Sequence, residues 1–152
     1  MFAYRNALYV WGGTSSTGEI FDTKLYRLDL SGKISSGMLK WEVVKPKKMS
    51  PSAREEHAGV LYKGCYYITG GNNSQNGGAL KDLWCLDMST LKWSCLKNGP
   101  LERHNHKMWA SQGKLYVLGG STLDRNCPDL YGNTFTVDDF RSEEHTSELQ
   151  SR

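Results

Sequence analysis

The sequence has no apolar run long enough to cross a membrane and no charged N-terminal segment followed by an apolar one. We therefore expect neither a membrane-spanning helix nor a secretory signal. None of the four cysteines belongs to a Cys-x-x-Cys pair, which argues against both a zinc site and a disulfide framework. The cysteines are expected to be thiols, mostly buried, in a protein of the cytoplasm or nucleus.

A concentrated positive charge is also missing. The chain has 19 Lys and Arg against 16 Asp and Glu, a formal net charge of +3, and its longest basic cluster is Lys45, Lys47 and Lys48. Binding to nucleic acid or to an anionic membrane surface requires a denser basic patch. We therefore expect neither of these as a partner.

Glycine and aromatic residues, by contrast, are abundant. The 152 residues include 16 glycines, and 11% are aromatic. So many glycines would destabilise a helical bundle, and they lack the three-residue period of collagen. They are expected in the turns and close backbone contacts of a strand-rich protein.

Three strand-like segments that contain tyrosine end in a double glycine, at residues 8–13, 66–71 and 115–120. The flanks repeat in register, since His57 and His106 stand thirteen residues before Gly70 and Gly119. An arginine and a proline precede each of these histidines by three and six residues. Identical offsets in two copies indicate a structural repeat.

Each copy continues after the double glycine with an apolar run that ends in aspartate and then with a tryptophan. These runs are residues 25–29 and 83–87, with a weaker third copy at 134–138, and the tryptophans are Trp41 and Trp93. The extra residues of the first copy fall between the runs. Each unit therefore predicts four short antiparallel strands joined by turns of variable length, which is typical of a propeller blade.

Taken together, the Arg-x-x-His pair, the strand ending in Gly-Gly, the strand ending in Asp and the following Trp resemble the kelch repeat. The resemblance covers nearly all of residues 1–140, with repeats at about 1–50, 51–99 and 100–140. It implies an all-β fold, an incomplete kelch-type β-propeller of about two and a half blades. The Pro-x-x-Arg-x-x-His opening is more similar to kelch proteins built mainly of the propeller than to those with a BTB domain.

The repeated residues are predicted to hold the blades together. A side chain at the double glycines would clash with the backbone of an adjacent blade, and the tryptophans would fill the gap between sheets. The repeated arginines either cap loop backbone or point to the rim. The structural residues are Gly12, Gly13, Trp41, His57, Gly70, Gly71, Trp93, His106, Gly119 and Gly120.

Residues 141–152 break from the repeat pattern and contain one strongly apolar residue. They resemble the translation of a sequencing-library adapter. We expect them to be a non-native tail, with a genuine polar tail or short surface helix as the alternative.

The sequence offers little support for catalysis or for a cofactor. His104 and His106 lie one residue apart, but His106 is explained by the repeat and only Glu102 stands at ligand spacing from His104, so no metal site is expected. The double glycines lack the Gly-Lys-Ser/Thr ending of a phosphate loop. Copper radical oxidases have kelch-like blades, but these repeats do not show the Tyr-Cys-His copper site. We expect no enzyme activity, with a propeller enzyme whose active site lies in other blades as the alternative.

The resemblance implies that the loops after Gly-Gly and the loops entering each blade open on one face, which commonly receives a protein or peptide partner. These loops are rich in Arg, Asn, Gln and Ser, which suit an acidic or backbone-rich peptide, although any propeller needs polar loops for solubility. We expect a non-catalytic protein-interaction module, such as a ubiquitin-ligase substrate receptor or an adaptor, and no small-molecule ligand. The candidate partner-binding residues are Arg54, Glu55, Asn72, Asn73, Gln75, Arg103, His104, Asn105, Ser121 and Arg125.

Overall fold

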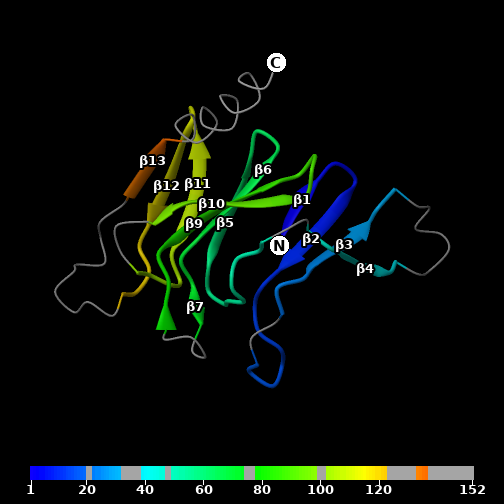
Figure 1. The fold of residues 1–152 in the computed structure, drawn as a ribbon, viewed down its shortest axis with the longest axis horizontal. Coiled ribbons are helices and arrows are strands. Elements are labelled where there is room, and N and C mark those ends of the chain that lie inside the picture. The colour runs from blue at the N-terminus through cyan, green and yellow to red at the C-terminus, as the bar shows by residue number, and fades with distance from the viewer. Residues whose placement is uncertain are drawn as a thin grey trace, which may run out of the picture.

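A computed structural model of the chain describes residues 1–19, 22–31, 39–46, 49–73, 78–98, 102–122 and 133–136. Within these residues the regular secondary structure consists of β-strands, which confirms the predicted all-β class (Figure 1). The strands are β1 (Phe2–Tyr4), β2 (Ala7–Trp11), β3 (Leu25–Asp29), β4 (Trp41–Val44), β5 (Ala58–Tyr62), β6 (Cys65–Thr69), β7 (Asn72–Asn73), β8 (Gly78–Ala79), β9 (Asp82–Asp87), β10 (Lys92–Asn98), β11 (Lys107–Ser111), β12 (Lys114–Leu118) and β13 (Asn133–Thr136).

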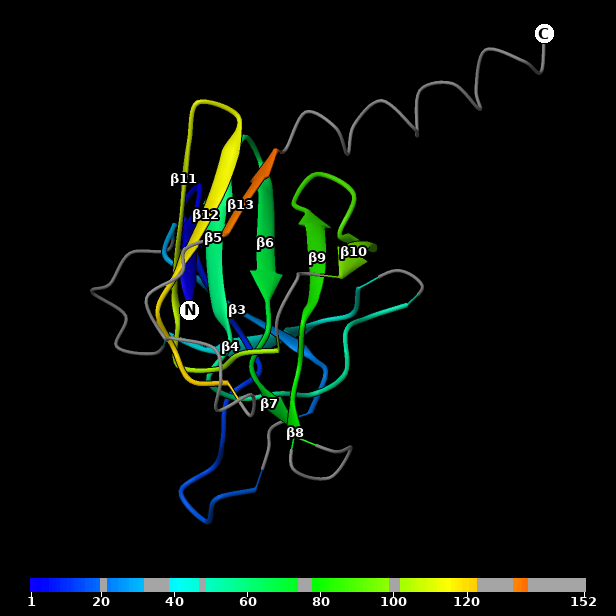
Figure 2. The ribbon, with the colours of Figure 1, turned by 90° about the vertical axis from the view of Figure 1, so that its left-hand side faces the viewer.

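The strands form three successive antiparallel sheets, one for each sequence repeat. The first sheet has the order β1-β2-β3-β4, the second β5-β6-β9-β10, and the third β11-β12-β13 within the described residues. The first strand of the second sheet, β5, also contacts β1 and β11, the first strands of the two neighbouring sheets (Figures 1 and 2). The sheets therefore stand side by side as blades, and we refer to them as the first, second and third blade.

Tight turns join the first two strands of each blade. At Lys63-Gly64 and Gln112-Gly113 both residues have positive φ, between 47° and 78°. Consecutive left-handed residues match the twist of a two-residue β-hairpin, and glycine at the second position adopts this conformation without a Cβ clash. A two-residue hairpin turn therefore joins the first two strands of the second blade and of the third.

The loop after the second double glycine contains an element that the sequence pattern does not predict. β7 and β8 pair as a short ribbon, with Asn72 opposite Ala79 and Asn73 opposite Gly78. The ribbon projects from the Gly-Gly end of the second blade (Figure 2). Two-residue strands are too short for the alternation of apolar and polar residues to show.

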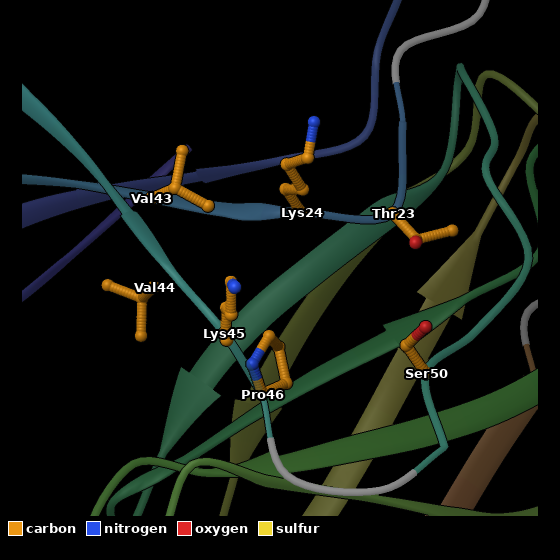
Figure 3. Close-up of a pocket in the computed structure, with 7 residues that line it drawn as sticks. All are labelled: Thr23, Lys24, Val43, Val44, Lys45, Pro46 and Ser50. Atoms are coloured by element: carbon orange, nitrogen blue, oxygen red, sulfur yellow. The ribbon is translucent and has the colours of Figure 1, made fainter.

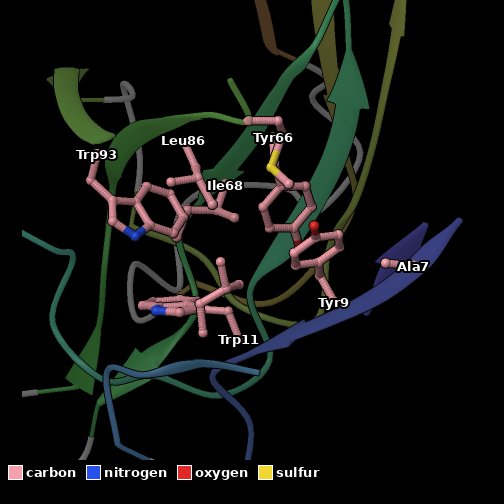
Figure 4. Packing of buried hydrophobic residues seen from close by; sticks show 9 residues of the cluster. Ala7, Tyr9, Trp11, Tyr66, Ile68, Leu86 and Trp93 are labelled. Carbon is pink, nitrogen blue, oxygen red and sulfur yellow. The ribbon is translucent and has the colours of Figure 1, made fainter. Parts of the chain in front are cut away.

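Aromatic and aliphatic side chains fill the interface between the first and second blades. The rings of Trp11 and Trp93 lie 5.4 Å apart between centroids (Figure 4). Phe2 stacks on Tyr66 with 3.8 Å between ring centroids. A second cluster, which includes Tyr67 and Leu115, lies between the second and third blades. All five residues of β6 are buried because this strand has a neighbouring sheet on each face.

Trp41 does not lie in such an interface. Trp41 is the first residue of β4, and its repeat equivalent Trp93 is the second residue of β10. Trp41 is 48% exposed, whereas Trp93 is 2% exposed. Trp93 packs against the first blade, but no described sheet covers the face of β4 that carries Trp41. The prediction that Trp41 fills a gap between two sheets is therefore wrong for this structure.

The cysteines of the described residues, Cys65, Cys85 and Cys95, form no disulfide. Cys65 is buried and Cys85 is half-buried, whereas Cys95 is exposed, so burial of the thiols is only partly as expected. Cys127 and the predicted tail at 141–152 lie outside the described residues. The part of the chain that the structure describes includes no helix long and apolar enough to span a bilayer.

Candidate partner-binding loop face

The double glycines all lie at one end of the blades, opposite the hairpin turns. We call this end the loop face. It comprises the segments that enter the second and third blades, residues 51–57 and 102–106, and the described residues directly after the double glycines of these two blades, 72–73 and 121–122. Because these segments connect rigid strands, their positions depend on how the blades meet beneath them.

Each repeated histidine lies between two double glycines. A Cβ added to Gly12 would lie 2.9 Å from the His57 ring, and a Cβ added to Gly71 would lie 2.9 Å from His57 Cβ. The first glycine of one blade and the second glycine of the next therefore leave space for the same histidine. His106 occupies the corresponding space between Gly70 and Gly120.

Burial lowers the pKa of both histidines to about 4, with a further contribution from the neighbouring arginines. Both rings are therefore neutral at pH 7. His57 also meets the Trp11 ring edge-on, with 5.3 Å between centroids. The histidines act as packing groups at the blade contact.

We expect Gly70→Ala to destabilise the chain more than Gly119→Ala. Both glycines have a left-handed backbone, with φ of 61° and 70°, so alanine costs about 1–2 kcal/mol at either position. At Gly70 the new methyl group would also meet the Arg103 carbonyl and the His106 ring, whereas nothing lies within 4 Å at Gly119. Overpacking should add about 1–3 kcal/mol at Gly70 alone. Urea denaturation followed by circular dichroism measures the difference, and equal losses would contradict the proposed contact.

The repeated arginines also connect neighbouring blades through hydrogen bonds to the double glycines. The N–H groups of Gly13 and Gly71 donate to the carbonyl oxygens of Arg54 and Arg103, each at 2.8 Å. Nη1 of Arg54 donates to the Gly70 carbonyl at 3.0 Å, and Arg103 makes the equivalent bond to Gly119 at 2.8 Å. Each arginine therefore links two blades. Its carbonyl oxygen accepts a hydrogen bond from the preceding blade, and its guanidinium group donates one within its own blade.

Arg54 also forms a bidentate ion pair with Asp82. Its two terminal nitrogens lie 2.5 and 2.8 Å from the carboxylate oxygens, and Trp84 Nε1 donates to the same carboxylate at 2.7 Å. Partial burial alone would raise the pKa of Asp82, but the bonds from Arg54 and Trp84 outweigh it and hold the pKa below its usual value. The carboxylate is therefore charged at neutral pH and balances the guanidinium charge.

Three of the predicted partner-binding residues are not accessible to a partner. Arg54 is 0% exposed, Asn73 3% and Arg103 7%. Asn73 Nδ2 donates to the Ala53 carbonyl at 2.6 Å, so its amide holds the entering segment in place. A buried guanidinium group requires internal acceptors, and both arginines have them. The prediction that these three side chains contact a partner is therefore corrected.

Four other predicted residues come together in pairs on the loop face. Glu55 and Asn72 exchange backbone hydrogen bonds of 3.0 and 2.8 Å, and His104 and Ser121 do so at 3.0 and 2.9 Å. The two pairs occupy equivalent repeat positions. Each pair joins the segment entering a blade to the segment after its double glycine.

The loops of the second and third blades also touch each other. His104 Nδ1 lies 2.7 Å from Glu56 Oε2, and the N–H of the exposed Asn105 donates to the Glu56 carbonyl at 2.9 Å. Glu56 and Asn105 share a left-handed backbone, with φ of 54° and 57°. The candidate residues predicted from the sequence include Asn105 but not Glu56, although both directly precede the repeated histidine.

The remaining two candidates, Gln75 and Arg125, lie outside the described residues. Within the described part, no three His, Cys, Asp or Glu side chains are grouped so that they could hold a metal ion.

Comparison with known proteins places this geometry in a family. The model described as the KLHDC2/KLHL20/DRC7 Kelch-repeats domain matches residues 1–148. This match passes residue 140, and the predicted domain boundary there stays a prediction. The solved structure of YjhT superposes with a TM-score of 0.59 at 23% identity, covering 79% of this chain and 32% of that chain.

Curated relatives carry the same repeats over part of their length. Host cell factor 2 of Homo sapiens is 31% identical in an alignment that covers 77% of this chain and 16% of that protein. Host cell factor 1 of Homo sapiens is 33% identical over 76% of this chain and 6% of that protein. Kelch domain-containing protein 3 of Bos taurus is 28% identical over 91% of this chain and 36% of that protein. The chain therefore belongs to the kelch-repeat family, and its fold is an incomplete kelch-type β-propeller.

Proposed function

We propose that the chain is a non-catalytic protein-interaction module that binds a protein or peptide partner through its loop face. The observation that supports this is the contact between the second and third blades, where Glu56, His104 and Asn105 meet. Their side chains are exposed or half-buried, while the arginines beneath them are buried in the blades. Polar loop residues on a rigid support are well suited to recognition because little order must be gained on binding.

The accessible chemistry differs from the sequence-based expectation. With Arg54 and Arg103 buried, the exposed or half-buried residues around this contact include two carboxylates, an imidazole, two amides and a hydroxyl. They are Glu55, Glu56, His104, Asn72, Asn105 and Ser121. This mixture of donors and acceptors suits a partner that presents both backbone and polar side-chain groups.

We further propose that the module acts as a substrate-recognition or scaffold subunit, including the substrate receptor of a ubiquitin ligase. The support is membership of the kelch-repeat family. A cytoplasmic or nuclear location is consistent with the three described cysteines, which form no disulfide. No positive observation favours the alternative of a propeller enzyme, and we do not propose it.

The test removes the loop tips without disturbing the blades. In the double variant Glu56→Gly and Asn105→Gly, glycine keeps the left-handed backbone at no steric cost while both side chains are lost. Affinity for a partner captured by the wild-type chain and identified by mass spectrometry should fall about tenfold, as for a contact near the centre of an interface. The melting temperature should stay nearly unchanged.

The matched control is Lys63→Gly with Gln112→Gly. These exposed residues have φ of 47° and 49° but lie in the hairpin turns at the opposite end of the blades. The control should retain the partner. Equal loss of binding in both double variants, or no loss in either, would contradict the assignment of the loop face.

A further inference from the structure

A pocket lies at the Gly-Gly end of the first blade, on its outer half, outside the segments that define the loop face and away from the contact between the second and third blades. Its volume is about 230 Å³, and it lies between the start of β3, the end of β4 and the segment leading to the second blade (Figure 3). Leu25 at the start of β3 pairs with both Trp11 and Val44, which places the pocket at the Gly-Gly end of the strands. The lining residues are Thr23, Lys24, Val43, Val44, Lys45, Pro46 and Ser50.

The lining combines positively charged and neutral hydrogen-bond donors with an apolar wall. Thr23 and Ser50 supply hydroxyl groups on one side, while Val43 and Val44 lie on the other with Lys45 and Pro46 between them (Figure 3). Hydroxyl groups and an ammonium group can donate hydrogen bonds to the same oxyanion. The apolar wall can contact the methylene groups that carry such an anion.

The charge at this position is opposite to that of the second blade. Lys24 and Asp82 each stand twelve residues after the first glycine of their blade, Gly12 and Gly70. In the second blade the Asp82 carboxylate accepts the internal guanidinium of Arg54. In the first blade the equivalent residue is the cation Lys24, whose binding partner would be an anion and not a guanidinium group.

The nearby carboxylate of Asp22 balances the charge of Lys24 but not that of Lys45. Lys24 Nζ lies 2.6 Å from Asp22 Oδ2, and both side chains are exposed. Lys45 adds a second positive charge, so the three groups together carry one net positive charge. Since Asp22 already balances Lys24, Lys45 and the two hydroxyls are the main donors for an incoming anion.

We propose that this pocket binds an oxyanion-bearing side chain of the protein partner, a carboxylate or a phosphate. The inference rests on the proposed function, which it deepens by placing recognition of an acidic group on Lys45, Thr23 and Ser50. The sequence led us to expect that Arg, Asn, Gln and Ser of the loops would bind an acidic or backbone-rich peptide, but the structure buries Arg54 and Arg103. The lysine pocket takes that role.

Binding of short probes tests the proposal. Three fluorescein-labelled peptides with blocked termini, Gly-Val-X-Val-Gly with X as Glu, phosphoserine or Gln, are titrated with the chain and followed by fluorescence anisotropy. The Glu or phosphoserine peptide should bind at least fivefold more tightly than the Gln peptide, and the tighter of the two identifies the source of the anion. Equal binding of all three peptides would overturn the proposal.

Variants then locate the binding site. Lys45→Gln should weaken binding of the acidic peptide about threefold to fivefold, as for one partly solvated ion pair, and Lys24→Gln should weaken it less. The double variant Thr23→Val with Ser50→Ala should also weaken binding of the acidic peptide, because it removes both hydroxyl groups with little change in the shape of the pocket. The matched control is Lys97→Gln, because Lys97 stands four residues after Trp93 as Lys45 stands four after Trp41. Equal effects of Lys45→Gln and Lys97→Gln would overturn the proposal.

Two comparisons separate this inference from the proposed function and from another class of ligand. If the chain captures its partner through Glu56 and Asn105 but no acidic peptide binds, the pocket assignment fails and the proposed function stands. A single-stranded DNA 10-mer that binds more tightly than the phosphoserine peptide would overturn the assignment to a protein side chain.

Discussion

Replacing Trp93 by alanine is expected to lower the free energy of unfolding by about 3–5 kcal/mol, the range for truncating a buried large aromatic residue. The Trp93 residue is 2% exposed and its indole packs against Trp11 across the interface between the first and second blades. Alanine would leave a cavity between two sheets that cannot collapse without moving the blades. Chemical denaturation followed by circular dichroism measures the loss without relying on tryptophan fluorescence.

Trp41→Ala is the matched control, since Trp41 occupies the same repeat position and is 48% exposed. Its loss should be no more than about 1 kcal/mol, because a half-exposed ring buries much less area. Similar losses at the two positions would show that packing between the described blades does not dominate the stability.

Arg54→Ala is expected to destabilise the chain by about 3 kcal/mol, the lower end of the range for breaking a buried ion pair. The lower end applies because the Asp82 side chain is 23% exposed and water can partly replace the lost partner. The substitution also removes the donor to the Gly70 carbonyl. Thermal and urea denaturation both report the loss.

Two comparisons separate geometry from charge. Arg54→Lys keeps the charge but not the bidentate bond to Asp82, so it should recover less than half of the lost stability. Arg27→Ala removes solvated ion pairs with Asp29 and Glu42 and should cost about 1 kcal/mol. A small effect of Arg54→Ala, equal to that of Arg27→Ala, would mean that Arg54 is not a structural residue.

The positions of the strands could be predicted from the sequence because the repeat carries the same information several times. Residues 25–29 and 83–87 were expected as strands and form β3 and most of β9. Apolar strands that end in glycine or aspartate leave few alternatives for the backbone. Turns such as Lys63-Gly64 are equally local, since glycine there accepts a left-handed conformation.

The direction of side chains was harder to predict because it depends on residues that are distant in the chain. The spacing of Arg54 and Arg103 fits the rim and the interior equally well, and Arg54 is buried because Asp82, 28 residues away, accepts its guanidinium group. Trp41 is half-exposed because no described sheet covers it. Glu56 joins the candidate site only through a contact with His104 of the next blade.

Hydrogen–deuterium exchange of the chain, measured with and without a captured partner, tests most directly where that partner binds. The account predicts that protection on binding concentrates at the loop face, in residues 54–57, 72–73 and 103–106, while the hairpin turns at 63–64 and 112–113 exchange as before. Protection confined to those hairpin turns or to the outer strand β10, with the loop face unchanged, would contradict it.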